Sequence, residues 1–439
     1  MFQKKEKYLC NAAEYSLLFQ PSGEILACHY NRGYILGNYP QNTIDDVWNG
    51  EKRKNLTKKI RKGNFPKTCE FCKRAIKNGF YNKSGINKYQ YITPGQSGYP
   101  SSMEFQLDNI CNLECIMCSG EYSALIRKNR EKGTPYISPY DENFVYQIKK
   151  YIHYLKQASF TGGEPFLIEI YYQIWDLIQI LNPHLQIYVS TNGTILNDKI
   201  KKYLDKLNFN FTISIDSLQK DNYEKIRRNA SLEKTLENID FFIRYAKTKN
   251  LNINIKSVVT PFNYKNIPEV LEFCNNNQIN FIPKTVLIPS FGNFSFSSEL
   301  IIDDATKTFE EIIKIKNPTS QTENNNYSRF KEILNEIKEI KKLRKETIEK
   351  YQNQSIKKLE KEFLKKMISQ KRLISNYSKT DLKEMAQKLI NSINDDESLK
   401  KSLISFLSVP SEIIASEFNR KDFNKLIERF RQCSIYEET

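Results

Sequence analysis

The stretch "DNICNLECIMCSG" (residues 108–120) decides the fold, because it sets three cysteines in a C-x3-C-x2-C array. These are Cys111, Cys115 and Cys118. A closed structural zinc site has four N or S ligands, whereas three protein ligands leave one position open. A cluster of four irons held by three thiolates likewise leaves one iron without a protein ligand. Thiolates suit both metals, so the array alone predicts an open metal site and does not choose the metal.

Around this array, strand-like and helix-like runs alternate from about residue 100 to residue 290. Strands are expected at 103–107, 158–161, 185–190, 209–215, 251–259 and 279–287, and helices at 142–157, 168–181, 198–207, 232–249 and 267–277. Six strands joined by helices imply right-handed parallel crossovers. The fold class is therefore α/β, as an open doubly wound sheet or a partial barrel, with reactive groups at the carboxyl ends of the strands.

Two regions of different composition flank this core and divide the chain at 1–98, 99–300 and 320–439. The first is rich in cysteine, with short strands and turns around "FQPSGEILACH" and a helix near "TIDDVWNGEKRKNLTKKIRKG". The last carries apolar residues at helical spacing: Phe330, Ile333, Leu334, Ile337, Ile340 and Leu343. Such a stripe predicts an intramolecular helical bundle or cap; a coiled coil or a partner-binding arm is the alternative.

The overall composition is that of a folded chain, and its net charge of +16 is strongly basic. The lysines are spread widely and many alternate with Glu, which favours a solvated surface over a nucleic-acid site. No stretch approaches the roughly 20 apolar residues of a membrane span, and the N-terminus lacks an apolar signal region. A cytoplasmic protein is expected, in which clustered cysteines indicate metal rather than disulfides.

Three further motifs follow the array, each where a predicted strand ends: "FTGGEPFL" (160–167), "VSTNG" (189–193) and "TISIDS" (212–217). They would share one rim of the sheet. With them, the sequence resembles the radical SAM superfamily, whose C-x3-C-x-Φ-C signature is met by the three cysteines with Met117 as Φ. The resemblance covers about residues 100–290 and implies a partial (β/α)6 barrel of TIM type.

The resemblance also implies a cofactor site. In this family the amine and carboxylate of S-adenosylmethionine (SAM) chelate the open iron of a [4Fe-4S] cluster, which explains the missing fourth cysteine. Gly162 and Gly163 let the backbone approach a ligand closely, and Glu164 offers a carboxylate to an ammonium group. The remaining residues assigned to the cofactor are Met117, Ser190, Asn192, Ser214 and Asp216. Taken singly, "STNG" could be only a turn and Asp216 only a helix N-cap.

A second group of cysteines lies in the N-terminal region: Cys10, Cys28, Cys69 and Cys72. Four thiolates close a site, which on chemistry alone is structural zinc or a fully ligated iron–sulfur cluster. The surrounding pattern resembles SPASM or twitch domains and implies an auxiliary [4Fe-4S] cluster that accepts electrons, relays them or supports structure. Such domains commonly follow the barrel, whereas this one precedes it. Cys274 and Cys433 are interpreted as small hydrophobes.

The resemblance implies an enzyme that cleaves SAM reductively to a 5'-deoxyadenosyl radical, which takes a hydrogen atom from substrate. A peptide or protein substrate is favoured, with a sugar or other small molecule as the alternative. A low-potential electron donor of flavodoxin or ferredoxin type is the expected partner, and no membrane or nucleic acid is expected. The alternatives are a zinc-dependent module that binds RNA or another acidic partner, and radical chemistry on RNA.

Overall fold

The computed structural model describes residues 10–77, 84–286, 292–315, 317–370, 377–411, 413–414, 426–428 and 430–431. Cys433 lies outside the described residues. The chain forms two compact units, Met1–Ser214 with Arg227–Ile253, and Ile215–Ile226 with Asn254–Thr439.

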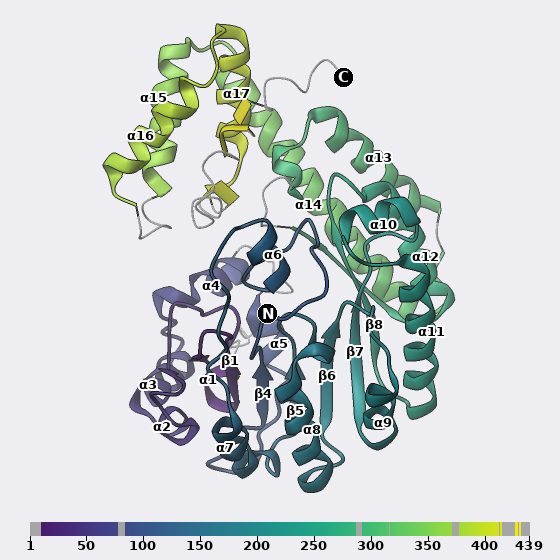
Figure 1. Ribbon diagram of the computed structural model, residues 1–439. Coiled ribbons are helices and arrows are strands. Elements are labelled where there is room, and N and C mark those ends of the chain that lie inside the picture. Colours follow the sequence, from purple (N-terminus) through teal and green to yellow (C-terminus); the bar gives the residue numbers. More distant parts are fainter. Residues whose placement is uncertain are drawn as a thin grey trace, which may run out of the picture. The chain divides into compact units, whose positions relative to one another are not determined.

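A largely parallel sheet forms the centre of the first unit (Figure 1). Its strand order is β3-β2-β1-β4-β5-β6-β7. The bounds are β1 (Ser16–Phe19), β2 (Glu24–Leu26), β3 (Gly37–Asn38), β4 (Ser102–Phe105), β5 (Gln157–Phe160), β6 (Gln186–Thr191) and β7 (Asn208–Ser214). Strands β4 to β7 pair in parallel in chain order, as the sequence predicts. The N-terminal hairpin extends the sheet, because β1 pairs in parallel with β4.

The two faces of this sheet differ in polarity. Phe105, Phe160, Val189 and Phe211 stand in register across β4 to β7 and are buried. Four helices belong to the same unit (Figure 1): α7 (Glu142–Ile152), α8 (Glu169–Leu181), α9 (Asp198–Lys206) and α11 (Leu232–Lys249). Each of them contributes further buried residues. Trp175 of α8 packs against Phe160. Because side chains alternate along a strand, the opposite face carries the polar row Glu104, Ser159, Tyr188 and Ser190.

The N-terminal region is mainly helical. Its helices are α1 (Ala12–Tyr15), α2 (Ile44–Trp48), α3 (Glu51–Arg61), η1 (Lys67–Cys69), α4 (Glu70–Lys77) and α5 (Gly85–Tyr89). The single helix expected over "TIDDVWNGEKRKNLTKKIRKG" is wrong, since two helices form there. Thr43 and Asp46 make a capping box at the start of α2, and Gly50 in an extended conformation is the N-cap of α3.

The second unit contains the last two predicted strands and the helical C-terminal region. Its elements include α10 (Lys220–Ile226), β8 (Ile253–Val259), α12 (Ile267–Asn276), β9 (Asn280–Thr285), α13 (Glu299–Ile315), α14 (Gln321–Tyr351), α15 (Ile356–Ser369), α16 (Lys379–Ile390) and α17 (Asp396–Ser408). Strands β8 and β9 pair in parallel. The predicted α/β class with a parallel sheet and a helical C-terminal region is thus confirmed.

The C-terminal helices bury a core of their own. Phe363, Met367, Leu382, Leu403 and Phe406 meet between α15, α16 and α17. The predicted stripe on α14 is buried from Phe330 to Ile337, whereas Leu343 is exposed. The apolar faces therefore pack within the chain, as expected of a bundle. None of the helices in the described ranges joins the length and apolar composition that crossing a bilayer needs.

Candidate metal and cofactor site

The three-cysteine array lies on the loop that follows β4. Asn109 closes this loop: its side chain donates to the carbonyl of Gly120 at 2.8 Å, and its own carbonyl accepts from Ala124 N–H at 2.8 Å. The Ser123 hydroxyl donates to the carbonyl of Leu113 at 2.8 Å. Of the thiols, Cys115 is buried and the other two are half-buried. The loop thus presents its thiols from a fixed backbone.

The TGGE segment after β5 packs directly against this loop. Gly163 N–H donates to the carbonyl of Asp108 at 3.1 Å, and Glu164 N–H donates to that of Ile110 at 2.7 Å. A Cβ on Gly163 would overlap the Ile110 carbonyl, and one on Gly162 would lie 2.6 Å from the Asp108 oxygen. Gly162 also has a φ of +119°, a region that favours glycine. The close approach that both glycines permit is therefore to the cysteine loop, and approach to a ligand stays a prediction.

Glu164 is fully buried and joins two strand ends. One carboxylate oxygen accepts from the Thr191 hydroxyl at 2.8 Å and from Phe166 N–H at 3.3 Å, and the other accepts from Asn192 N–H at 2.8 Å. Burial raises the pKa of Glu164 to about 7, although these hydrogen bonds favour the charged form. The carboxylate consequently holds the "STNG" turn, and its contact with a cofactor stays a prediction.

The "STNG" turn reaches the cysteine loop through Asn192. Its side-chain nitrogen donates to the side-chain oxygen of Asn112 at 2.9 Å and lies 4.0 Å from the Cys111 sulfur. Asn112 in turn donates to the Thr194 hydroxyl at 2.9 Å. Ser190 is exposed on the polar face of the sheet. Two of the three predicted rim motifs are thus brought to the array within the first unit.

The other predicted cofactor residues lie in both units of the chain. Met117 is half-buried on the cysteine loop, and Ser214 is half-buried at the end of β7. Asp216 belongs to the second unit, where its carboxylate accepts from Val258 N–H at 2.7 Å and its carbonyl accepts from the Asn263 side chain at 2.8 Å. Their assignment to SAM stays a prediction.

Two arginines that no sequence motif indicates lie beside the thiols. Arg227 is buried, with a guanidinium nitrogen 3.9 Å from the Cys115 sulfur. Arg130 donates to the carbonyls of Cys115 and Cys118 at 3.2 and 2.7 Å. Burial raises the pKa of the Cys118 thiol to about 11, and the charges of both arginines oppose that rise. Because thiols become negative when they bind metal, these cations suit a thiolate-bound group.

Tyr171 of α8 fixes the ends of β4 and β5. Its buried hydroxyl lies 2.6 Å from the Thr161 carbonyl and accepts from Leu107 N–H at 3.0 Å. We expect Tyr171→Phe to lower the free energy of unfolding by about 1–3 kcal/mol, because both partners would stay buried and unpaired. Tyr172→Phe is the matched control, since that hydroxyl donates only to the Phe166 carbonyl. Equal losses for the two variants in urea denaturation would contradict the predicted role of Tyr171.

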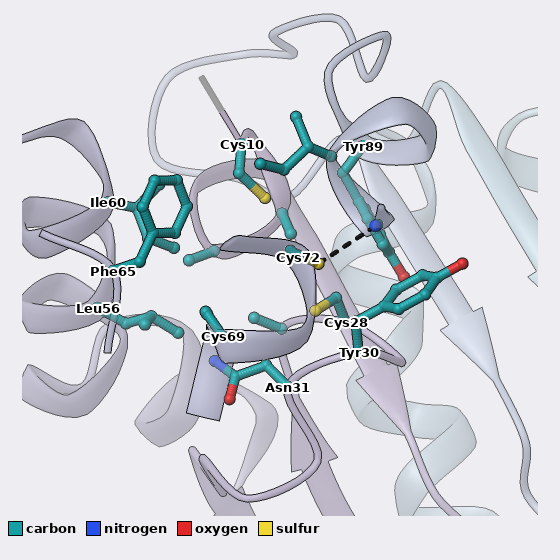
Figure 2. Close-up of a pocket in the computed structure, with 15 residues that line it drawn as sticks. Cys10, Cys28, Tyr30, Asn31, Leu56, Ile60, Phe65, Cys69, Cys72 and Tyr89 are labelled. Atoms are coloured by element: carbon teal, nitrogen blue, oxygen red, sulfur yellow. Dashed lines mark hydrogen bonds between the residues drawn. The ribbon is translucent and has the colours of Figure 1, made fainter. Parts of the chain in front are cut away.

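The second cysteine group lines one pocket in the N-terminal region, whose empty volume with its open mouth is about 390 Å³. Figure 2 shows Cys10, Cys28, Cys69 and Cys72 around it, with Leu56, Ile60 and Phe65 on one side and Tyr30 and Tyr89 on the other. Gly85 N–H donates to the Cys72 sulfur at 3.2 Å. Burial raises the pKa of all four thiols, that of Cys10 to about 11 and that of Cys69 to about 12.

Four thiols in one pocket suit two kinds of metal site. In the part of the chain that the structure describes, no three His, Cys, Asp or Glu side chains are grouped so that they could hold one metal ion. A zinc ion needs ligands that converge on one point, about 2.3 Å from each sulfur. In a cubane each thiolate binds a different iron, so its sulfurs stand farther apart. Four thiols that share one pocket could hold a fully ligated [4Fe-4S] cluster or a zinc ion, and their geometry does not choose between the two.

Two contacts connect the N-terminal region to β4 and to the array. Glu104 of β4 is buried and accepts from Tyr89 and Lys88 at 2.5 Å and from His29 at 2.7 Å. Burial alone would raise the pKa of Glu104. The charge of Lys88 and the hydrogen bond from His29 instead hold this pKa far below its usual range. Arg32 pairs with Glu121, three residues after Cys118, at 2.8 Å. Both cysteine sites thus belong to one connected structure.

Comparison with protein-family models gives two matches. Residues 106–274 match the radical SAM superfamily. Residues 10–74 match an iron–sulfur cluster-binding domain, SPASM. The first match contains the three-cysteine array and all the rim motifs, and the second contains the four cysteines of the pocket. Both resemblances read from the sequence are confirmed, and so is the N-terminal place of the second domain.

Among curated proteins, GTP 3',8-cyclase of Aliarcobacter butzleri is 30% identical over 169 residues, which are 38% of this chain and 49% of that protein. The probable GTP 3',8-cyclase of Methanocaldococcus jannaschii is 23% identical over 189 residues, 42% of this chain and 59% of that protein. The chain thus spans about half the length of these relatives.

Solved structures are similar over part of the chain. AnSMEcpe with bound AdoMet has a TM-score of 0.38 and 20% identity, and the match covers 48% of this chain and 57% of that one. Streptococcus suis SuiB bound to S-adenosylmethionine has a TM-score of 0.33 and 12% identity, with 62% of each chain covered. The two family matches show that the chain contains a radical SAM domain over residues 106–274, with an iron–sulfur cluster-binding domain over residues 10–74 ahead of it.

Proposed function

We propose that the chain is a radical SAM enzyme that cleaves SAM reductively and abstracts hydrogen from a substrate. The observation that carries the proposal is the loop of Cys111, Cys115 and Cys118, which offers three thiols and is packed against the TGGE segment. When bound, a [4Fe-4S] cluster with SAM at its open iron supplies a 5'-deoxyadenosyl radical. The three cysteines would hold the cluster.

The chain's own residues have three tasks in this proposal. Arg227 and Arg130 place positive charge beside the thiolates, which offsets the negative charge of a reduced cluster. Glu164 and Asn192 fix the turn that faces Cys111 and offer polar atoms to the methionyl part of SAM. Ser190, Ser214 and Asp216 remain the candidates for the sugar and methionyl groups.

The auxiliary site is proposed to hold a second [4Fe-4S] cluster on Cys10, Cys28, Cys69 and Cys72. All four thiols are used, so this cluster has no open iron for SAM and serves electron transfer or structure. The functional division proposed is 1–98 for the auxiliary domain, 99–300 for the radical SAM domain and 320–439 for the helical extension. A reducing compartment such as the cytoplasm would keep the thiols available.

Two substrate classes remain as proposals. A peptide or protein is the class that the resemblance to auxiliary-cluster enzymes favours. A purine nucleotide is the second candidate, because the similar curated proteins are GTP 3',8-cyclases. We expect the true class to raise the rate of 5'-deoxyadenosine release over the substrate-free rate, so GTP and a peptide library can be compared in one assay.

The proposed reaction is tested by anaerobic reconstitution with iron, sulfide, dithionite and SAM. We expect 5'-deoxyadenosine and methionine in equal amounts, measured by liquid chromatography, together with iron and acid-labile sulfide in the protein. Zinc at Cys111, Cys115 and Cys118, or a cluster whose EPR spectrum does not respond to SAM, would overturn the proposal. Zinc with tight RNA binding would instead support the binding-module alternative.

Glu164→Gln separates the structural and cofactor roles of this residue. Gln must turn its amide nitrogen toward Asn192 N–H or toward the donors Thr191 and Phe166, so one hydrogen bond of about 1.5–3 kcal/mol is lost. We expect SAM affinity to fall, as measured by equilibrium dialysis, while the iron content of the reconstituted protein stays that of the wild type. Unchanged SAM affinity would remove Glu164 from the cofactor site.

A further inference from the structure

The positive charge of the chain is concentrated beside the auxiliary site. Residues 51–77 contain eleven Lys or Arg and only two Asp or Glu. Their balance is +9, whereas the whole chain carries +16. More than half of the net charge therefore lies in a segment that includes α3, η1 and α4 and the thiols Cys69 and Cys72. General solubility does not explain why the positive charge is concentrated in this one segment.

Helix α3 has one face on the pocket and one toward solvent. Leu56 and Ile60 are buried and line the pocket of the four thiols (Figure 2). The exposed basic side chains are Lys52, Lys54, Lys58, Lys59, Arg61 and Lys62. The wall of the pocket is thus the inner side of a strongly basic surface.

Several of these lysines form no contact that stabilises the described part of the fold. Arg61 pairs with Glu14 and Lys54 with Glu51. Lys58, Lys59 and Lys62 make no ion pair or side-chain hydrogen bond among the residues that the structure describes. Their charges are therefore unneutralised, and unneutralised like charges on neighbouring turns repel each other and cost stability.

An aromatic pair lies at the same site. Tyr30, which lines the pocket, stacks on Phe71 with ring centroids 5.7 Å apart. The two are 39% and 43% exposed, and Phe71 stands between Cys69 and Cys72 in the sequence. Lys67 and Lys73, both exposed, flank the two cysteines. A partly exposed aromatic pair therefore lies at the auxiliary site, and exposed lysines stand close to Phe71 in the sequence.

We propose that this surface, made by the exposed lysines of 51–73 with Tyr30 and Phe71, docks an acidic one-electron carrier protein of flavodoxin or ferredoxin type. The inference rests on the proposed function, because it takes the auxiliary site to hold a cluster. Transient redox complexes use small interfaces whose association depends on complementary charge. In the complex one electron leaves the reduced carrier and enters the auxiliary cluster, and no bond or proton is transferred.

The placement of the charge favours a carrier over an acidic substrate. A substrate must reach the radical generated at Cys111, Cys115 and Cys118, whereas the basic helix α3 forms a wall of the pocket of the other cysteine group. A carrier needs the opposite arrangement, with its docking face next to a cluster that lies near the surface. Cys10 and Cys69 are only half-buried, in keeping with such access.

The test measures binding of the reconstituted protein to an acidic flavodoxin and, separately, to a [2Fe-2S] ferredoxin, by anaerobic calorimetry at low and high salt. We expect Lys58→Glu/Lys59→Glu/Lys62→Glu to weaken binding at least 10-fold, and wild-type binding to weaken as salt rises. The control is Lys202→Glu/Lys206→Glu/Lys234→Glu, which makes the same charge change at exposed lysines of α9 and α11. The control variant should bind like the wild type.

The outcomes distinguish a failure of the docking surface from a failure of the proposed radical SAM function. Equal binding of both carriers by the two triple variants would overturn the docking surface while leaving SAM cleavage intact. Tighter binding of a polyglutamate peptide or a single-stranded RNA than of either carrier, lost in the first variant alone, would also overturn it. Failure of dithionite to drive SAM cleavage in the wild type would instead overturn the proposed function. Loss of carrier-driven cleavage alone, with dithionite-driven cleavage kept, would support the docking surface.

Discussion

Replacing Cys118 by alanine is expected to abolish SAM cleavage. Three thiolates hold three irons of the proposed cluster, so the loss of one leaves a second iron without a protein ligand. We expect the reconstituted protein to carry about four irons in place of about eight, the number for two [4Fe-4S] clusters. Production of 5'-deoxyadenosine should fall below detection. Iron analysis and chromatography of the reaction mixture measure both quantities.

Cys274→Ala is the matched control for this loss. Cys274 is fully buried on α12, and burial raises the pKa of its thiol, as expected of a small core residue. Its replacement should keep both clusters and SAM cleavage. Cys69→Ala completes the set: it should lose the auxiliary iron while dithionite-driven cleavage continues. If Cys118→Ala retained cleavage, or Cys274→Ala lost the same iron, the ligand assignment would be wrong.

The order of elements could be predicted from the sequence because each carries a local pattern. The helix expected at 232–249 is α11, with the same bounds, since Ser231 caps its start and Asn250 in the left-handed conformation ends it. The strand expected from residue 251 begins at Ile253 instead. The single helix expected over α2 and α3 is divided at Asn49 and Gly50, where α2 ends and Gly50 in an extended conformation becomes the N-cap of α3.

The candidate site could be predicted only in part. The cysteines and the glycines stand in short motifs, so their spacing was visible. Tyr171 and Arg227 have no such signal: Tyr171 contacts Leu107, and Arg227 approaches Cys115, across more than sixty residues of chain. Thr191 belongs to the "VSTNG" motif, but its hydroxyl donates to Glu164, which follows a different strand. Contacts of this kind depend on tertiary packing, which no local pattern encodes.

The distribution of charge could also be predicted from the sequence only in part. From the sequence, the lysines were interpreted as a solvated surface, because many alternate with Glu along helices. The fold places the lysine-rich segment 51–77 beside the auxiliary pocket and turns its apolar residues Leu56 and Ile60 inward. A run of lysines can be assigned to a particular surface only when the buried side of its helix is known.

Gly163→Ala is expected to disrupt the radical SAM site without touching a ligand. The added Cβ would overlap the Ile110 carbonyl and lie 2.7 Å from the Asn109 carbonyl carbon, both of them backbone atoms. Backbone cannot rotate away as a side chain can, so the TGGE segment or the cysteine loop must shift. We expect the free energy of unfolding to fall by about 1–3 kcal/mol, and iron bound at the three-cysteine array to fall with it.

Gly133→Ala is the control on the same part of the chain. Its Cβ would meet only the flexible side chain of Arg127, with the nearest atom at 3.3 Å. That variant should therefore keep stability and iron content close to those of the wild type. Urea denaturation and iron analysis of both variants decide the matter. If Gly163→Ala assembled its SAM cluster as fully as Gly133→Ala does, the packing of TGGE on the cysteine loop would not be what positions the thiols.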